Sequence, residues 1–178
     1  SSSGNIDAIG IITATTFTGT IQTAAQTNIT SVGTLSGLTV SADSTINSVT
    51  VGKGANSVAN NTVLGESALD AAVTGGNNTV MGSGSLGANT SGTNNTALGR
   101  GVLNASTTAS NNTGVGYFAL VSNTTGAENT AVGANALDAN TTAANNTAIG
   151  FAVLTENTTG QDNTCLLYTS DAADEWWG

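Results

Sequence analysis

A six-residue phrase recurs along this chain at a constant spacing, and that spacing constrains the fold more than any other feature. The phrase reads NNTVMG at 77–82, NNTALG at 94–99 and NNTAIG at 145–150. Its second asparagine recurs every 17 residues, at Asn61, Asn78, Asn95, Asn112, Asn129, Asn146 and Asn163. Six repeats run without an insertion or deletion, which indicates one structural unit stacked on copies of itself.

Two further residue types keep the same period. A glycine recurs at Gly65, Gly82, Gly99, Gly116, Gly133 and Gly150, and a leucine at Leu69, Leu86, Leu103, Leu120, Leu137 and Leu154. The unit is shorter than the helix pairs of α-solenoids, which use more than about 30 residues. It is also rich in Thr, Asn and Gly, which are poor helix formers. We therefore expect each repeat to contain two short strands, one carrying the NTALG-type residues and one beginning at the Ala-Leu pair.

Stacking of these repeats predicts columns of equivalent side chains about 4.8 Å apart. We expect the asparagines to form a hydrogen-bonded ladder, which satisfies buried amides. The leucines are expected to form a thin core together with an aliphatic column at Leu64, Met81, Leu98, Val115, Val132 and Ile149. Two large apolar residues per repeat make a small core, so we also expect a homotrimer in which three rolls share an axis.

The predicted fold class is thus all-β, a parallel β-roll or β-solenoid of 17-residue repeats with a β-rich stalk before it. We divide the chain into the stalk or lead-in at 1–58, six or more repeats at 59–164, and a tail at 165–178. The tail has Leu167 and Asp171 where the period predicts glycine and leucine. Residues 165–175 resemble the translation of a transposase mosaic-end sequencing adapter. We interpret the tail as non-native sequence joined to a gene cut at Thr164, and assign no role to Cys165.

Composition excludes several function classes. Two Lys and Arg against eleven Asp and Glu give a net charge of −9, which argues against a nucleic-acid partner. No apolar run reaches membrane-spanning length, so no membrane insertion is expected. The chain lacks histidine and its one cysteine lies in the tail, which removes the usual nucleophile–base pairs and zinc sites. Asp70 and Asp138 share a column, but four repeats place them about 19 Å apart, too far for glycoside hydrolysis. We expect no catalysis, metal or cofactor.

The column after the glycine varies freely, which is typical of positions that face solvent. It reads Glu66, Ser83, Arg100, Tyr117, Ala134 and Phe151. Tyr117, Phe118 and Phe151 are therefore predicted to form an exposed aromatic strip. Such a strip could stack on a host glycan as a receptor contact, or pack laterally against a neighbouring subunit; the second interpretation is the simpler.

The repeat NTAVGANALDANTTAAN at 129–145 resembles the repeats of bacteriophage and giant-virus tail-fibre proteins. INSVTVG at 46–52 is similar to the head repeats of trimeric autotransporter adhesins. The resemblance covers 15–164 and implies a trimeric β-roll in a virion tail fibre that attaches to a host cell-surface glycan or protein receptor. Many such fibres end in a self-cleaving chaperone domain, and nothing in this sequence matches one.

Two alternative functions remain open from the sequence. The first is the head region of a bacterial trimeric adhesin, located on the cell surface. The second is an ice-binding β-solenoid, because the threonine pairs Thr124–Thr125, Thr141–Thr142 and Thr158–Thr159 stack in register.

Overall fold

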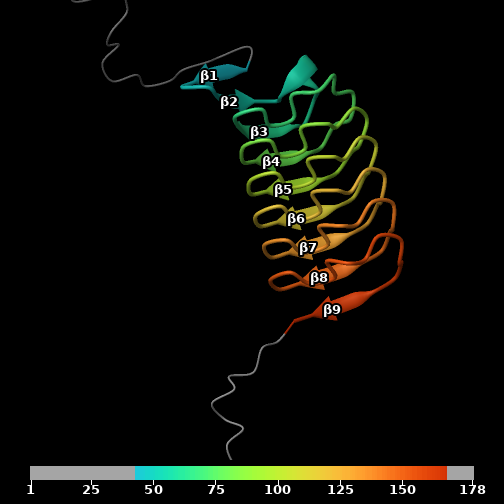
Figure 1. The fold of residues 1–178 in the computed structure, drawn as a ribbon. Helices are drawn as coiled ribbons and strands as arrows, with labels where there is room; N and C mark the ends of the chain where they lie inside the picture. The colour runs from blue at the N-terminus through green and yellow to red at the C-terminus, as the bar shows by residue number, and fades with distance from the viewer. Residues whose placement is uncertain (1–42, 168–178) are drawn as a thin grey trace, which may run out of the picture. The chain divides into compact units, whose positions relative to one another are not determined.

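The structure, a computed structural model, describes residues 43–167, and within this part of the chain nine strands form one sheet in sequence order (Figure 1). Strands β1 (Ser44–Ile46) and β2 (Val49–Gly52) form an antiparallel hairpin, and β2 pairs antiparallel with β3. A short 3₁₀ segment, η1, covers Ala55–Ser57. The strands from β3 onward are parallel to one another: β3 (Thr62–Gly65), β4 (Thr79–Met81), β5 (Thr96–Leu98), β6 (Thr113–Val115), β7 (Thr130–Val132), β8 (Thr147–Ile149) and β9 (Thr164–Leu166).

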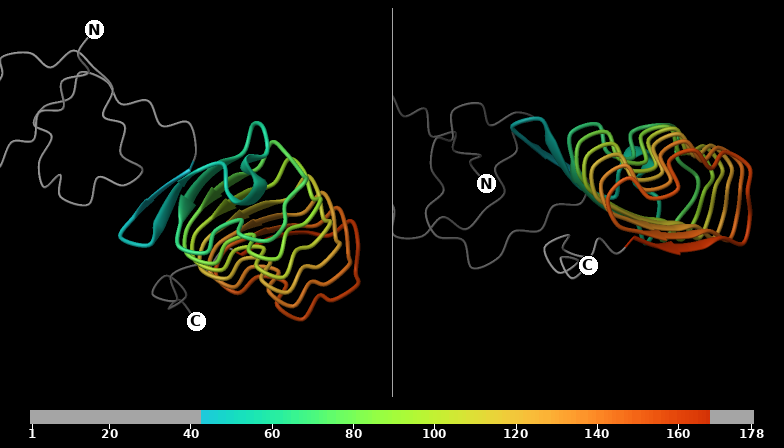
Figure 2. Two further views of the ribbon diagram at one scale, coloured as in Figure 1. Left: turned by 90° about the horizontal axis from the view of Figure 1, so that it is seen from above. Right: turned by 60° about the horizontal axis from the view of Figure 1, so that its bottom comes forward.

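Each parallel strand is one side of a 17-residue turn, which we call a rung. Thr62 pairs with Thr79, and Thr79 with Thr96, so the register advances by one repeat from strand to strand. Figure 2 shows rungs of nearly the same outline lying over one another. The prediction of an all-β parallel β-solenoid with 17-residue turns is therefore confirmed.

The boundaries predicted for the stalk and the tail fall largely outside the described residues. Of the stalk at 1–58, the structure describes 43–58, which hold β1, β2 and η1. Of the tail at 165–178, it describes Cys165, Leu166 and Leu167, the first two of which lie in β9. Residues 1–42 and 168–178 are not described.

The prediction of two strands per repeat was wrong, because the Ala-Leu segment is a bend rather than a strand. Leu86, Leu103 and Leu120 have φ of 51°, 53° and 54°, in the left-handed region. A left-handed residue cannot continue a strand, and it costs an L-amino acid about 1–2 kcal/mol. Each of these leucines is fully buried, which stabilises the fold by about 1.5–3 kcal/mol and offsets that cost. The leucine column thus lies in the core as predicted, but on a bend.

The prediction that the aliphatic column belongs to the core was also wrong. In β4, Val80 is 1% exposed whereas Met81 is 52% exposed. Successive side chains of a strand point to opposite faces, so an inward Asn78 places Val80 inside and Met81 outside. The residues that pack against the leucines are the smaller ones one position earlier: Val63, Val80, Ala97, Gly114, Ala131 and Ala148.

The recurring glycine after each strand allows the rungs to approach closely. Gly82, Gly99 and Gly116 have φ of 132°, 132° and 131°. A Cβ on Gly99 would overlap the carbonyl oxygen of Gly116 in the next rung. A side chain here would therefore push successive rungs apart, so glycine is needed wherever another rung follows.

Candidate functional surfaces

The ladder asparagines lie inside the solenoid and join each rung to the next. The backbone N–H of Asn95 donates to Oδ1 of Asn78 at 2.9 Å, and Nδ2 of Asn95 donates to the same oxygen at 3.1 Å. Nδ2 of Asn95 also donates to the carbonyl of Ala109 at 2.9 Å, across its own rung. The same pattern recurs at Asn78, Asn112, Asn129 and Asn146. Because these side chains are buried and satisfied, their role is structural.

A second column of buried polar side chains was missed from the sequence. It holds Asn89, Ser106, Asn123 and Asn140, and the half-buried Asn157 continues it in the next rung. Nδ2 of Asn140 donates to Oδ1 of Asn123 at 2.9 Å and to the carbonyl of Ala143 at 3.1 Å. Ser106 breaks this column, and its buried hydroxyl has no hydrogen-bond partner among the described residues. The sequence signal that could have revealed this column is the 17-residue recurrence of asparagine directly before the threonine pairs.

The outer face of the sheet is a continuous surface without charged side chains. We define the outer sheet face by two columns on β3–β9, a threonine column that runs from Thr62 to Thr164 and an aliphatic column that runs from Leu64 to Leu166. The sequences of these strands contain no Asp, Glu, Lys or Arg. Large apolar side chains are exposed on it, Met81 and Ile149 among them. In an acidic chain this neutral, ridged surface is the part best suited to lateral contact.

Two of the three aromatic residues predicted to form a strip lie together. The rings of Tyr117 and Phe118 have centroids 4.2 Å apart at an interplanar angle of 40°. Tyr117 is 49% exposed and Phe118 is half-buried. Phe151 is 68% exposed but lies two rungs further along, with Ala134 between it and Tyr117 in the column. The aromatic surface is therefore a pair and a separate single ring.

Arg100, to which the sequence assigned no role, completes a cluster with the aromatic pair. Its guanidinium carbon lies 5.7 Å from the centroid of the Tyr117 ring and 5.1 Å from that of Phe118. Nη1 of Arg100 donates to the Tyr117 hydroxyl at 3.3 Å. These cation–π distances are within the range of about 6 Å at which the attraction is significant. The rings thus hold the guanidinium over the surface.

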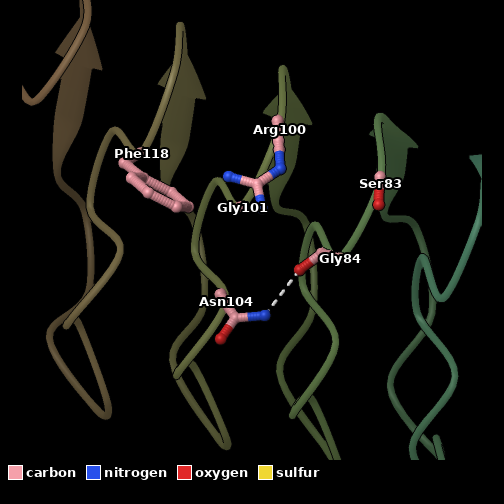
Figure 3. A pocket seen from close by; sticks show the side chains of 6 residues that line it. All are labelled: Ser83, Gly84, Arg100, Gly101, Asn104 and Phe118. Atoms are coloured by element: carbon pink, nitrogen blue, oxygen red, sulfur yellow. Dashed lines mark hydrogen bonds between the residues drawn. The ribbon is translucent and has the colours of Figure 1, made fainter.

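A cleft of about 250 Å³ opens beside this cluster (Figure 3). Its lining comes from three successive rungs: Ser83, Gly84, Arg100, Gly101, Asn104 and Phe118. Nδ2 of Asn104 donates to the carbonyl of Gly84 at 2.7 Å, which ties one edge of the cleft to the preceding rung. A cation, an aromatic ring and a side-chain amide therefore converge on one recess, which we call the Arg100 cleft.

In a comparison with known proteins, no protein family, curated protein or solved structure matches the chain. Within residues 43–167, no three His, Cys, Asp or Glu side chains lie close enough together to hold a metal ion. The same residues contain no helix of the length and apolarity needed to cross a membrane. The Arg100 cleft and the outer sheet face are two candidate surfaces that the described residues provide.

Proposed function

We propose that this chain is a structural and adhesive segment of a virion tail fibre, in which three copies associate in parallel through their outer sheet faces. The best support is the uncharged outer sheet face on a chain whose net charge is −9. Copies of such a chain repel one another unless they meet through a neutral surface. The resemblance of 129–145 to tail-fibre repeats supports a virion location. The head of a bacterial trimeric adhesin, on the cell surface, is the alternative.

The size of the outer sheet face sets the expected strength of association. Seven strands at about 4.8 Å and three residues at about 3.3 Å each give roughly 340 Å² per copy, or about 1,000 Å² in a trimer. A trimer shares this area among three pairwise interfaces, so each buries roughly 340 Å², well below the area of about 1,000 Å² expected for one specific stable interface. We therefore expect association that depends on concentration and that salt strengthens, because salt screens the repulsion between acidic copies.

Sedimentation of the full chain tests this proposal over about 1–100 µM, a range suited to a small interface. We expect a mass of three chains at the upper end. Ile149→Lys places a charge on the outer sheet face without touching the core, and should give monomers with an unchanged circular dichroism spectrum. Thr142→Lys, at an exposed corner, is the matched control and should still associate. A wild-type chain that stays monomeric across the whole range, with or without salt, contradicts the proposal.

Ice binding is the second candidate function, and the same surface favours it. The threonine column of β3–β9 presents one residue per rung on the sheet, at a constant spacing. The stacked threonine pairs, such as Thr124–Thr125, are less suitable for binding ice than their sequence spacing suggested. The hydroxyl of Thr124 already donates to the carbonyl of Thr141, at 3.0 Å. A monomer that shows thermal hysteresis would favour ice binding over the fibre. A trimer with no thermal hysteresis would favour the fibre.

A further inference from the structure

Two neighbouring rungs that line the Arg100 cleft lack a side chain in the same column. That column reads Ser67, Gly84, Gly101, Phe118, Asn135 and Ala152. All six residues have left-handed φ, from 49° at Ser67 to 67° at the two glycines. Serine, phenylalanine, asparagine and alanine therefore tolerate this backbone, so the glycines are not needed for the bend. Gly101 makes room for the Phe118 ring, whose atoms lie where a Cβ would be, and Gly84 leaves the neighbouring part of the recess open.

The groups around the recess have unused hydrogen-bonding capacity. A guanidinium carries five N–H donors, and that of Arg100 makes one hydrogen bond, to Tyr117, among the described residues. Asn104 donates from Nδ2 to Gly84, which leaves its Oδ1 as an acceptor at the rim. Ser83 adds an exposed hydroxyl to the lining of the cleft. Figure 3 shows the Arg100 guanidinium and the Asn104 amide on the same side of the Phe118 ring, so donors for an anion and an acceptor for a hydroxyl line one recess.

The charge at this site is unusual for the chain. Lys53 and Arg100 are its only cations, and eleven carboxylates give it a net charge of −9. No carboxylate is hydrogen-bonded to Arg100 within residues 43–167. Arginine binds a carboxylate through two parallel N–H groups, and these charge-assisted hydrogen bonds are stronger than those between neutral groups. The free guanidinium therefore indicates a ligand that brings its own carboxylate.

We infer that the Arg100 cleft binds a carboxylated sugar, such as a uronic-acid unit of a surface polysaccharide. The carboxylate would meet the Arg100 guanidinium, the ring would pack on Phe118, and a sugar hydroxyl would donate to Oδ1 of Asn104. A cleft of about 250 Å³ is below the range of about 300–1,000 Å³ for drug-sized ligands, and so suits one ring. This inference rests on the proposed role in host-surface attachment and names the ligand class.

The test is a titration of the full, ¹⁵N-labelled chain with glucuronate, followed by NMR at the amides of Gly84 and Gly101. We expect saturable shifts with a millimolar dissociation constant, and at least tenfold weaker binding of glucose, which lacks the carboxylate. Acetate should also bind at least tenfold more weakly, because it lacks the ring. Equal binding of glucuronate and either control overturns the inference, as does the absence of saturable shifts.

Two variants assign the binding to this cleft. Arg100→Gln removes the charge at an exposed position, and Gly84→Asn fills the recess with a side chain that the column already accepts at Asn135. Each should weaken glucuronate binding at least tenfold while the circular dichroism spectrum is unchanged. Lys53→Gln and Phe151→Ala, a cation and an aromatic residue outside the cleft, should bind as the wild type does. Unchanged binding by Arg100→Gln overturns the assignment.

The failure of this inference is distinguishable from failure of the fibre proposal, because the two are read from different signals in one sample. A monomer that binds glucuronate through Arg100 contradicts the trimer and supports the site. A trimer that gives no shift at Gly84 and Gly101 supports the fibre and overturns the site.

Discussion

Ser106 interrupts a buried column of asparagines, and we predict that Ser106→Asn stabilises the solenoid. Asn89 and Asn140 show what the missing amide does. Nδ2 of Asn89 donates to the carbonyl three residues on, at 3.2 Å, and Nδ2 of Asn140 donates to Oδ1 of Asn123 in the preceding rung. The equivalent partners for a new amide at position 106 are the carbonyl of Ala109 and Oδ1 of Asn89. Both are already in place.

The expected gain follows from the hydrogen bonds formed and the hydroxyl removed. Two buried hydrogen bonds contribute about 1 kcal/mol each, and loss of an unsatisfied hydroxyl contributes about 1 kcal/mol more. Ordering the longer side chain costs about 1 kcal/mol. The net gain of about 2 kcal/mol corresponds to a rise in melting temperature of about 5–10 °C for a domain of this size.

Thermal unfolding followed by circular dichroism measures this gain, with two controls. Asn123→Ser creates the same defect one rung later and should lower the free energy of unfolding by a similar amount. Ser106→Ala removes the unpartnered hydroxyl and should leave the melting temperature unchanged or higher. The reasoning is refuted if Ser106→Asn melts no higher than the wild type, or if Ser106→Ala melts clearly lower, since the hydroxyl would then have a partner.

Two further predictions concern the packing of the rungs, and both are read from melting temperatures. Gly84→Ala should cost about 1–2 kcal/mol, the cost of a left-handed L-residue that Ala152 already bears in the same column. Gly99→Ala should cost more, at least about 3 kcal/mol, because its new Cβ also overlaps the Gly116 carbonyl. Equal effects of the two substitutions would contradict the close approach at Gly99. Leu103→Ala should cost about 2–5 kcal/mol and Met81→Ala less than about 0.5 kcal/mol, since only the leucine is in the core. A larger loss for Met81→Ala than for Leu103→Ala would indicate that the aliphatic column does belong to the core.

The architecture was predictable because it depends on spacing alone. An exact repeat of an amide, a glycine and a leucine requires equivalent environments, and stacked rungs provide them. The residues of the inner face could also have been predicted from the sequence. Asn61 and Leu64 are three residues apart, so a period of two cannot place both inside, and an inward Asn61 selects Val63. The small inner residues Ala97 and Gly114 concealed this, because large apolar residues are normally the better guide to a core.

The bend at the leucines and the Arg100 cleft were beyond the sequence for physical reasons. Leucine rarely adopts a left-handed backbone, so propensity favours the strand that does not form. The bend reverses the chain and carries Asn104 back beneath Gly84 of the preceding rung. Since that contact depends on the bend, no reasoning from spacing could place Asn104, Arg100 and Phe118 around one recess. The sequence supplied the residues, and the left-handed turn brings them together.

The asparagine ladder has a direction, which bears on how the chain folds during synthesis. Each asparagine donates to the rung before it and offers its own Oδ1 to the rung that follows, as Asn78 does between Asn61 and Asn95. The side-chain hydrogen bonds of a ladder asparagine therefore need only its own rung and the rung before it. A ribosome adding about 5–20 residues per second completes a rung in about 1–3 s. Each finished rung presents the acceptor that orders the next one. The ladder is thus a vectorial template that runs from the amino terminus toward the carboxyl terminus, in the order of translation.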